Sequence, residues 1–327
     1  MKKWCAVALG AAVMLGGWGD RAQAADLVLK FAHEAPATAI KGRSADKLAE
    51  LVEKYTNGSV KIEVFPGGQL VPTTEEIRAA VRGQVDIIAP YTSYYSAIDS
   101  SWDIFYQPML FTSPEQAMKV FAGPIGVGLL NKLDNSGLKG LSIWHDGPVY
   151  AFTKGEPALT PASLKGQKVR VAPSKPIETM LEKIGATSIS MPATEVYLAL
   201  QQGVANGVIT TPTYAAPARW GEVLTTMTRS LWGVGGYGVA MNKRSWAKMS
   251  AEQQEGFMRA VKETEEWNQQ QTLQNISASE EALAKGGMKI HDLTPEQREE
   301  WVGLAKDIWA AAPADVKAMI TEVQKSQ

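Results

Sequence analysis

The chain has 327 residues, enough for two ordinary domains of roughly 150 residues each. Hydrophobic residues make up 45% of the sequence, which supports well-filled cores, and the formal net charge is −1. A charge this close to zero argues against electrostatic capture of nucleic acid or of an anionic membrane.

The first 24 residues have the three parts of a secretory signal peptide. Lys2 and Lys3 form a positive start, residues 4–18 are apolar and uncharged, and residues 22–24 (Ala-Gln-Ala) form a small-x-small cleavage site. A membrane anchor is the competing interpretation, but the apolar run is shorter than the roughly 20 residues of a spanning helix. We therefore expect cleavage near Ala24 and a periplasmic protein. The only cysteine, Cys5, lies in this segment, so the mature chain would have none.

Residues 25–147 begin with an alternation of strands and helices. Apolar runs at 27–32, 60–65 and 85–89 predict strands, and amphipathic runs around 48–55 and 77–82 predict the helices between them. His33 follows the first strand, and Tyr91 and Thr92 follow the third, in a loop dense in rings and hydroxyls. These three residues are candidate ligand contacts, although structural roles for them stay open.

Residues 160–214 repeat the same alternation. Strands are predicted at 168–171, 188–191 and 207–210, with helices on either side of the middle strand. The two copies have matching residues at the boundaries of their elements. Gly83 and Gly203 suit helix ends, and Asp86 and Asn206 suit the entry to the next strand. Two similar α/β halves imply two lobes with a cleft at the carboxyl ends of the strands.

Arg170 fits poorly with a purely structural role. It lies between Val169 and Val171 in a strand that should be covered on both faces, and a buried guanidinium needs an anionic partner or several carbonyl oxygens. The alternative is an edge strand from which Arg170 points into water. Strand-like runs at 141–144 and 149–153 are expected to cross between the lobes, which would place Trp144 and Tyr150 near the hinge.

A long helix is predicted over residues 250–285, and Ser250 and Gln253 form a capping box at its start. Its apolar residues are spaced so that it could lie across both lobes. We expect residues 25–147 and 236–275 to form lobe 1, and residues 148–235 and 276–327 to form lobe 2.

The sequence has no motif for catalysis, metal binding or cofactor binding in the context that such a motif requires. Residues 233–238 match G-x-G-x-x-G, but a strand-like run follows where a dinucleotide site needs a helix. The three histidines are far apart, and there is no G-x-S-x-G elbow. The sequence therefore predicts no metal site, no cofactor and no enzymatic activity.

The residues resemble those of the periplasmic solute-binding subunits of tripartite ATP-independent periplasmic (TRAP) transporters, the DctP-type family. The resemblance covers essentially the whole mature chain. It is carried by FAHEAP, VFPGGQL and DIFYQPMLFTSPEQA in the first half of the chain, and further along by TPASLKGQKVRV, LEKIGATSISMPATEVYLALQQGVANG and MNKRSWAKMSAEQQ.

The resemblance implies a two-lobed α/β periplasmic binding protein (type II-like) that closes on an organic acid. Its partners would be a small-molecule carboxylate and the small and large membrane permease subunits, and we expect a monomer. The family's arginine that pairs with the ligand carboxylate falls on Arg170. The binding protein of an ATP-driven (ABC) importer and a periplasmic enzyme on the same fold are the alternatives.

The sequence departs from the family pattern in two places. Residues 209–212 (Ile-Thr-Thr-Pro) stand where the family has Glu-Asn-Pro, so Thr211 takes the ligand-contacting position. The crossing strand lacks the second arginine of many members and has Tyr150 nearby. With the rings of Tyr91, Trp144, Tyr150 and Tyr214 expected near the cleft, we favour a monocarboxylate with an aromatic or apolar body.

Overall fold

The computed structural model describes residues 25–326, so the predicted signal peptide and its cleavage site lie outside the described residues. The described strands form one mixed sheet in the order β2-β1-β3-β8-β4-β7-β5-β6, with β9 paired to β8. The strands are β1 (Leu27–Ala32), β2 (Val60–Phe65), β3 (Ile87–Ile88), β4 (Leu138–Thr153), β5 (Lys168–Val171), β6 (Thr187–Ser190), β7 (Gly207–Thr210), β8 (Thr226–Asn242) and β9 (Lys289–Asp292).

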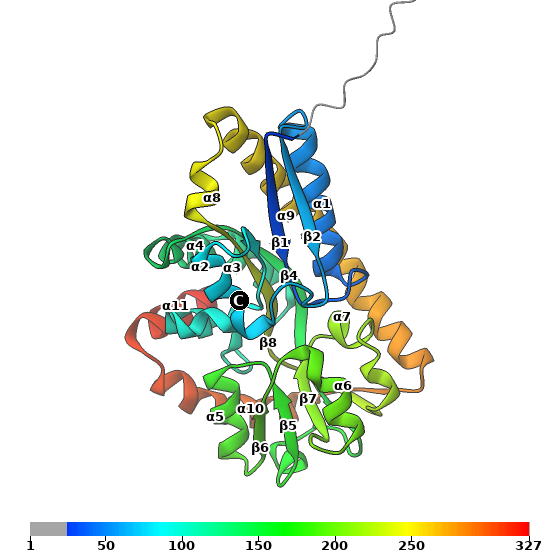
Figure 1. The fold of residues 1–327 in the computed structure, drawn as a ribbon. Helices are drawn as coiled ribbons and strands as arrows, with labels where there is room; N and C mark the ends of the chain where they lie inside the picture. Colours follow the sequence, from blue (N-terminus) through cyan, green and yellow to red (C-terminus); the bar gives the residue numbers. More distant parts are fainter. Residues whose placement is uncertain (1–24, 327) are drawn as a thin grey trace, which may run out of the picture.

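Helices cover this sheet and give the molecule an upper and a lower part in Figure 1. The α-helices are α1 (Ile40–Tyr55), α2 (Glu76–Arg82), α3 (Pro114–Ala122), α4 (Pro124–Lys132), α5 (Lys175–Lys183), α6 (Ala193–Gln201), α7 (Pro212–Ala215), α8 (Lys243–Ala247), α9 (Ala251–Lys285), α10 (Pro295–Ala311) and α11 (Ala314–Lys325). Short 3-10 helices include η2 (Thr92–Ala97), η3 (Ser100–Tyr106) and η6 (Trp220–Glu222). None of the described helices combines the length and apolar character that a membrane crossing needs.

The two halves have the same local topology. β1 pairs in parallel with β2 and β3, and β5 pairs in parallel with β6 and β7, so the first strand of each half is central. Gly83 and Gly203 have φ values of 77° and 74°, which glycine adopts without steric cost. The Asp86 and Asn206 side chains each accept a hydrogen bond of 2.8 Å, from the backbone N–H of Lys30 and Lys168 respectively. The matching boundary residues therefore have the same structural roles in both lobes.

Two long antiparallel strands, β4 and β8, join the halves. The predicted runs at 141–144 and 149–153 are parts of one strand, β4, which pairs with β8 over nearly its whole length. The pairing shifts register between His145 and Gly147, at the point where the lobe boundary was expected. Such a bulge bends the strand and redirects the side chain within it, here Asp146.

The predicted long helix is α9, and the capping box at Ser250 and Gln253 is present. It packs against α1 and β4 in lobe 1 and against α7 in lobe 2, running from the upper to the lower part of Figure 1. The Asn268 side chain accepts a hydrogen bond from His145 N (2.6 Å) and donates one to His145 O (3.3 Å). The helix therefore fixes β4 beside its bulge.

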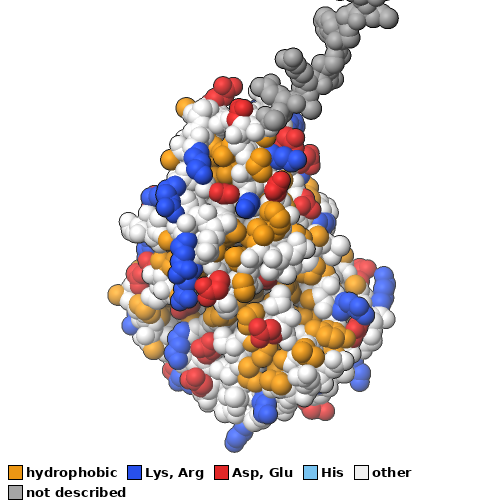
Figure 2. Space-filling model, viewed as in Figure 1, with side chains coloured by type: hydrophobic (Ala, Val, Ile, Leu, Met, Phe, Trp, Pro, Cys, Tyr) orange, Lys and Arg blue, Asp and Glu red, His pale blue; other side chains and the backbone are white. Residues whose placement is uncertain are grey.

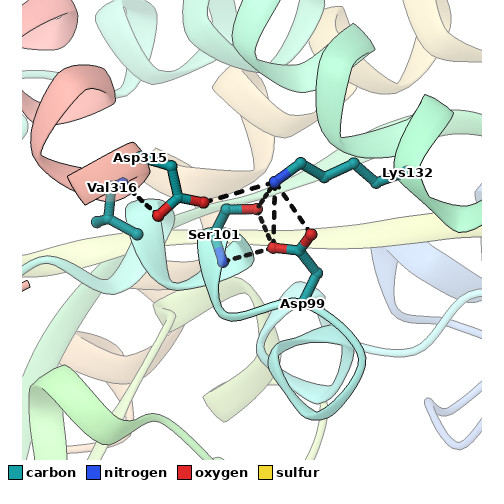
Figure 3. Close-up of polar contacts among 5 residues, drawn as sticks. All are labelled: Asp99, Ser101, Lys132, Asp315 and Val316. Carbon is teal, nitrogen blue, oxygen red and sulfur yellow. Dashed lines mark hydrogen bonds and ion pairs between the residues drawn. The ribbon is translucent and has the colours of Figure 1, made fainter. Parts of the chain in front are cut away.

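The C-terminal helices contact both lobes. α10 packs against α5, whereas α11 packs against η3, in the range expected for lobe 1. Figure 3 shows Lys132 of α4 directed toward Asp99 and Ser101 and toward Asp315 of α11. Its Nζ lies 3.0 Å from Asp99 Oδ2 and 3.6 Å from Asp315 Oδ2, and it donates to Ser101 Oγ at 2.7 Å. This ion-pair network holds α11 against the upper part of the molecule.

The surface agrees with the near-zero net charge. Acidic and basic side chains are interspersed over the face in Figure 2, and neither sign forms a continuous patch there. That face therefore offers no extended field of one sign for a nucleic acid or an anionic membrane.

Candidate functional site

A small cavity with about 30 Å³ of free space lies where the two lobes meet. Lobe 1 and the crossing strands contribute Glu34, Thr73, Tyr91, Tyr94, Asp146 and Tyr237 to its wall. The second lobe's contribution includes Arg170, Ala172, Ile209, Thr210, Tyr214 and Trp220. Because residues from both lobes line the cavity, a bound molecule would contact both lobes at once.

Arg170 is the only Lys or Arg among the described residues that line this cavity. β5 lies between β6 and β7, so the edge-strand alternative is wrong, and the side chain is 4% exposed. Its Nε and Nη2 donate to the carbonyl oxygen of Met191 at 3.1 and 2.6 Å, and the guanidinium lies 5.8 Å from the centre of the Trp220 ring. Within residues 25–326 it forms no salt bridge. Burial lowers the pKa of Arg170.

Three tyrosines surround this guanidinium. Tyr91, Tyr94 and Tyr214 all line the cavity, and each is close enough for its charge state to affect the pKa of Arg170. Burial raises the pKa of Tyr94 to about 12 and raises that of Tyr214 well above its usual value. Their hydroxyl groups therefore stay protonated at neutral pH and can donate hydrogen bonds to an anion.

Asp146 is a second charged group on the wall, and it comes from the bulge in β4. Its carboxylate accepts hydrogen bonds from Thr211 Oγ1 (2.6 Å) and Thr213 Oγ1 (3.0 Å). Burial raises the pKa of Asp146, while the two threonine hydroxyls stabilise its charged form. Gly235 keeps the region compact, because a β-carbon there would come within 2.5 Å of Tyr91 Oη. The glycine-rich run at 233–238 is therefore a packing feature of β8.

Glu34 is the third charged group on the wall, and it is paired with a lysine of lobe 1. Its Oε2 accepts a short hydrogen bond from Lys41 Nζ, and the Lys41 side chain is fully buried. The Lys41 ammonium also lies 4.1 Å from the centre of the Tyr237 ring. Glu76, also fully buried, has its pKa raised well above the usual value, first by burial and then by the charge of Glu34. Lys41 is thus already neutralised within lobe 1.

Three of the eight residues predicted as ligand contacts, Arg170, Tyr91 and Tyr214, line the cavity. The other five are buried but are not part of its wall. Thr211 donates to Asp146 and caps α7, Thr92 shares a hydrogen bond with Tyr106 (2.9 Å), and Trp144 packs near Phe31. His33 is 1% exposed with a pKa lowered to about 3, mainly by burial, and Tyr150 lies on β4 opposite Thr210. None of these five lines the cavity, so direct ligand contact by them stays a prediction.

Several wall residues were not singled out from the sequence. Glu34 and Tyr94 stand beside predicted contacts, in loops already placed at the cleft, so their position was available as a signal. Asp146 and Tyr237 could not be found in this way, because the bulge in β4 and its pairing with β8 decide where they point. No group of three or more His, Cys, Asp or Glu able to hold a metal ion occurs among residues 25–326.

Two α/β lobes around a small interlobe cavity, joined by long crossing strands, define a solute-binding protein of the periplasmic type. Residues 31–315 match the bacterial extracellular solute-binding protein family 7 (DctP). The chain therefore belongs to this family, and the resemblance to TRAP solute-binding subunits is confirmed.

Individual relatives agree with the family assignment. The chain is 33% identical over 311 residues to the C4-dicarboxylate-binding periplasmic protein DctP of Rhodobacter capsulatus, covering 92% of this chain and 93% of the relative. It is 32% identical to the C4-dicarboxylate-binding protein DctB of Bacillus subtilis, with 84% and 79% covered. A TRAP periplasmic solute binding protein from Sulfurospirillum deleyianum, solved with bound succinate, superposes with a TM-score of 0.86 at 30% identity, covering 93% of this chain and all of that one.

A second solved structure gives the same result. The TRAP periplasmic solute binding protein from Shewanella oneidensis has a TM-score of 0.88 at 25% identity, covering 92% of this chain and 99% of the other. The two-lobed α/β fold predicted from the sequence is thereby confirmed. These relatives are solute-binding proteins, which agrees with a receptor and does not favour the enzyme or ABC-importer alternatives.

Proposed function

We propose that this protein is the periplasmic receptor of a TRAP-type transporter, capturing an organic acid between its lobes and delivering it to the small and large permease subunits. One observation carries the proposal: Arg170 is a buried guanidinium on the cavity wall that no Asp or Glu of the described chain neutralises. An uncompensated buried charge is costly, so the site favours an anion supplied from outside.

A carboxylate suits this site better than a simple anion. The planar guanidinium can present parallel N–H groups to both oxygens of a carboxylate, which adds orientation to affinity. The hydroxyl groups of Tyr91, Tyr94 and Tyr214 add donors around it. The names of the Rhodobacter and Bacillus relatives and the succinate in the Sulfurospirillum structure support four-carbon acids as the first candidates.

Closure of the lobes would follow from contacts with both. A ligand that touches Tyr94 in lobe 1 and Arg170 in lobe 2 binds the closed form more tightly, and this difference in affinity shifts the equilibrium toward it. We propose that residues 25–147 and 236–275, together with α11, move against residues 148–235 and 276–311 by bending of β4 and β8. We also propose export to the periplasm with removal of residues 1–24.

The test is calorimetry of the mature chain with four-carbon acids, comparing wild type with Arg170→Ala. Loss of the charge-assisted pair should cost roughly 2–5 kcal/mol of binding free energy. Arg229→Ala is the matched control, because Arg229 already pairs with Glu280 and Asp292 and does not line the cavity. Near-normal affinity in Arg170→Ala would reject the proposal.

A further inference from the structure

Among residues 25–326, the cavity wall combines one cation that lacks an acidic partner with two carboxylates. Arg170 is the cation, and Glu34 and Asp146, here called the acceptor pair, are the carboxylates. Glu34 comes from the loop after β1 in lobe 1 and Asp146 from the bulge in β4 between the lobes, so neither is on β5, the strand that supplies Arg170. A ligand reaching across the cavity from Arg170 therefore meets acceptors.

Asp146 has hydrogen-bonding capacity to spare. It is 2% exposed, and Thr211 and Thr213 each donate to a different oxygen of its carboxylate. A carboxylate offers about four lone-pair sites; the two threonines and the Tyr237 hydroxyl, whose hydrogen bond favours the charged form of Asp146, take three, so roughly one remains for a ligand. An ionised carboxylate accepts but does not donate, so the complementary ligand group must be a donor.

Glu34 presents a similar surface. Lys41 binds its Oε2, which leaves Oε1 without a bond to that lysine, and the residue lines the cavity. Lys41 itself is fully buried behind Glu34 and against the Tyr237 ring, and it does not line the cavity. Lys41 could otherwise have bound a second ligand carboxylate, but its ammonium group already forms an ion pair with Glu34.

A second carboxylate on the ligand would thus lie beside the acceptor pair without a free cation among the described wall residues. Like charges at close range in a poorly solvated site repel strongly. We propose that the acid captured here carries a single carboxylate, bound by Arg170, and hydrogen-bond donors on its body, either hydroxyl or ammonium groups, bound by Glu34 and Asp146. This inference rests on the proposed function and assigns the acceptor pair as its specificity-determining residues.

Four acids of four carbons each separate the possibilities. Butyrate has one carboxylate and no donor, erythronate adds hydroxyl groups, 4-aminobutyrate adds an ammonium group, and succinate adds a second carboxylate. Calorimetry at pH 7.5 on the mature chain should show erythronate or 4-aminobutyrate binding at least tenfold more tightly than both butyrate and succinate. Whichever of the two binds more tightly identifies the donor as hydroxyl or ammonium.

Asp146→Asn tests the assignment of the acceptor. The amide keeps the shape and one acceptor oxygen but replaces the other with a donor. We expect the preference for the donor-bearing acid over succinate to fall about tenfold. Glu265→Gln is the matched control, since Glu265 accepts a hydrogen bond from Ser142 (2.8 Å) away from the cavity, and it should leave the order of affinities unchanged. Thermal unfolding checks that both variants fold.

The outcomes distinguish this inference from the proposed function. Succinate binding as tightly as or more tightly than the donor-bearing acids, in wild type and in Asp146→Asn alike, overturns the inference, while dependence on Arg170 would leave the receptor function standing. An unchanged order of affinities in Asp146→Asn likewise overturns the role given to Asp146. If none of the four acids binds and Arg170→Ala changes nothing, the proposed function fails as well.

Discussion

The two lobes share a topology, and each buries a cation near the cavity, but the two cations are in opposite electrostatic situations. Lys41 in lobe 1 is paired with Glu34, whereas Arg170 in lobe 2 contacts the Met191 carbonyl oxygen and the face of Trp220 and has no acidic partner among the described residues. The pair in lobe 1 is complete without a ligand. Burial of a charge therefore does not by itself mark a binding site, whereas a buried charge without a partner does.

Removal of Lys41 from the complete pair should change the stability of the protein more than any other variant considered below. Lys41→Met should destabilise the protein by about 3–5 kcal/mol, because it leaves the Glu34 carboxylate buried without a counter-charge. Chemical denaturation measures this change. The double variant Lys41→Met, Glu34→Gln should recover most of the loss, and a double variant as unstable as the single one would contradict the account of the pair.

A smaller effect is expected from pH, through histidines that are buried in a neutral state. Burial lowers the pKa of His33 and of His145 to about 3, from about 6.5 in an unfolded chain. Between these values the unfolded chain binds more protons, so stability is complete above about pH 6.5 and falls as the pH drops. Each imidazole should cost about 2 kcal/mol between pH 6.5 and 5. Glu76, whose pKa is raised, acts in the opposite direction.

The His145→Gln variant isolates one of these contributions. Its free energy of unfolding, measured by denaturation at pH 6.5 and 5, should fall less than that of wild type. Equal losses in wild type and His145→Gln would show that this imidazole is not kept neutral by burial.

The matching residues Asp86 and Asn206 should also differ in how much they contribute to stability. Asp86 accepts hydrogen bonds from Lys30 N and from the Ser245 hydroxyl, whereas Asn206 accepts one from Lys168 N. Asn206→Ala should cost about 1 kcal/mol and Asp86→Ala about 2 kcal/mol, since bonds to a charged acceptor are stronger. Denaturation midpoints test the order, and a larger loss for Asn206→Ala would contradict it.

The smallest stability effect should come from the unpaired cation. Arg170→Met removes a buried charge together with its hydrogen bonds to Met191, and these contributions oppose each other. The free energy of unfolding without ligand should therefore stay within about 1 kcal/mol of wild type. A loss as large as that in Lys41→Met would mean that Arg170 is a structural residue.

Much of the fold could be predicted because the local signals agree with the global structure. The period of the apolar residues, Gly83 and Gly203, and the capping box at Ser250 place the elements of both lobes within a few residues of their positions. Arg170 could be found because a charge between two valines contradicts its surroundings. That contradiction is visible in the sequence itself.

The rest of the site depends on contacts between distant segments. Asp146 faces the cavity because β4 has a bulge opposite Gly235 and because Asn268 of α9 fixes His145 beside it. Lys41 is unavailable to a ligand because the chain between β1 and α1 brings Glu34 to it. Neither the register of β4 on β8 nor the pairing of Lys41 with Glu34 can be predicted from the local sequence.

A crystal structure of the mature protein with a bound acid would be the decisive test of the role given to Arg170. We predict that both oxygens of one ligand carboxylate lie within hydrogen-bonding distance of the Arg170 guanidinium, with Lys41 still bound to Glu34. A ligand whose carboxylate avoids Arg170, or an Arg170 that turns to an Asp or Glu of the protein itself, would contradict the account.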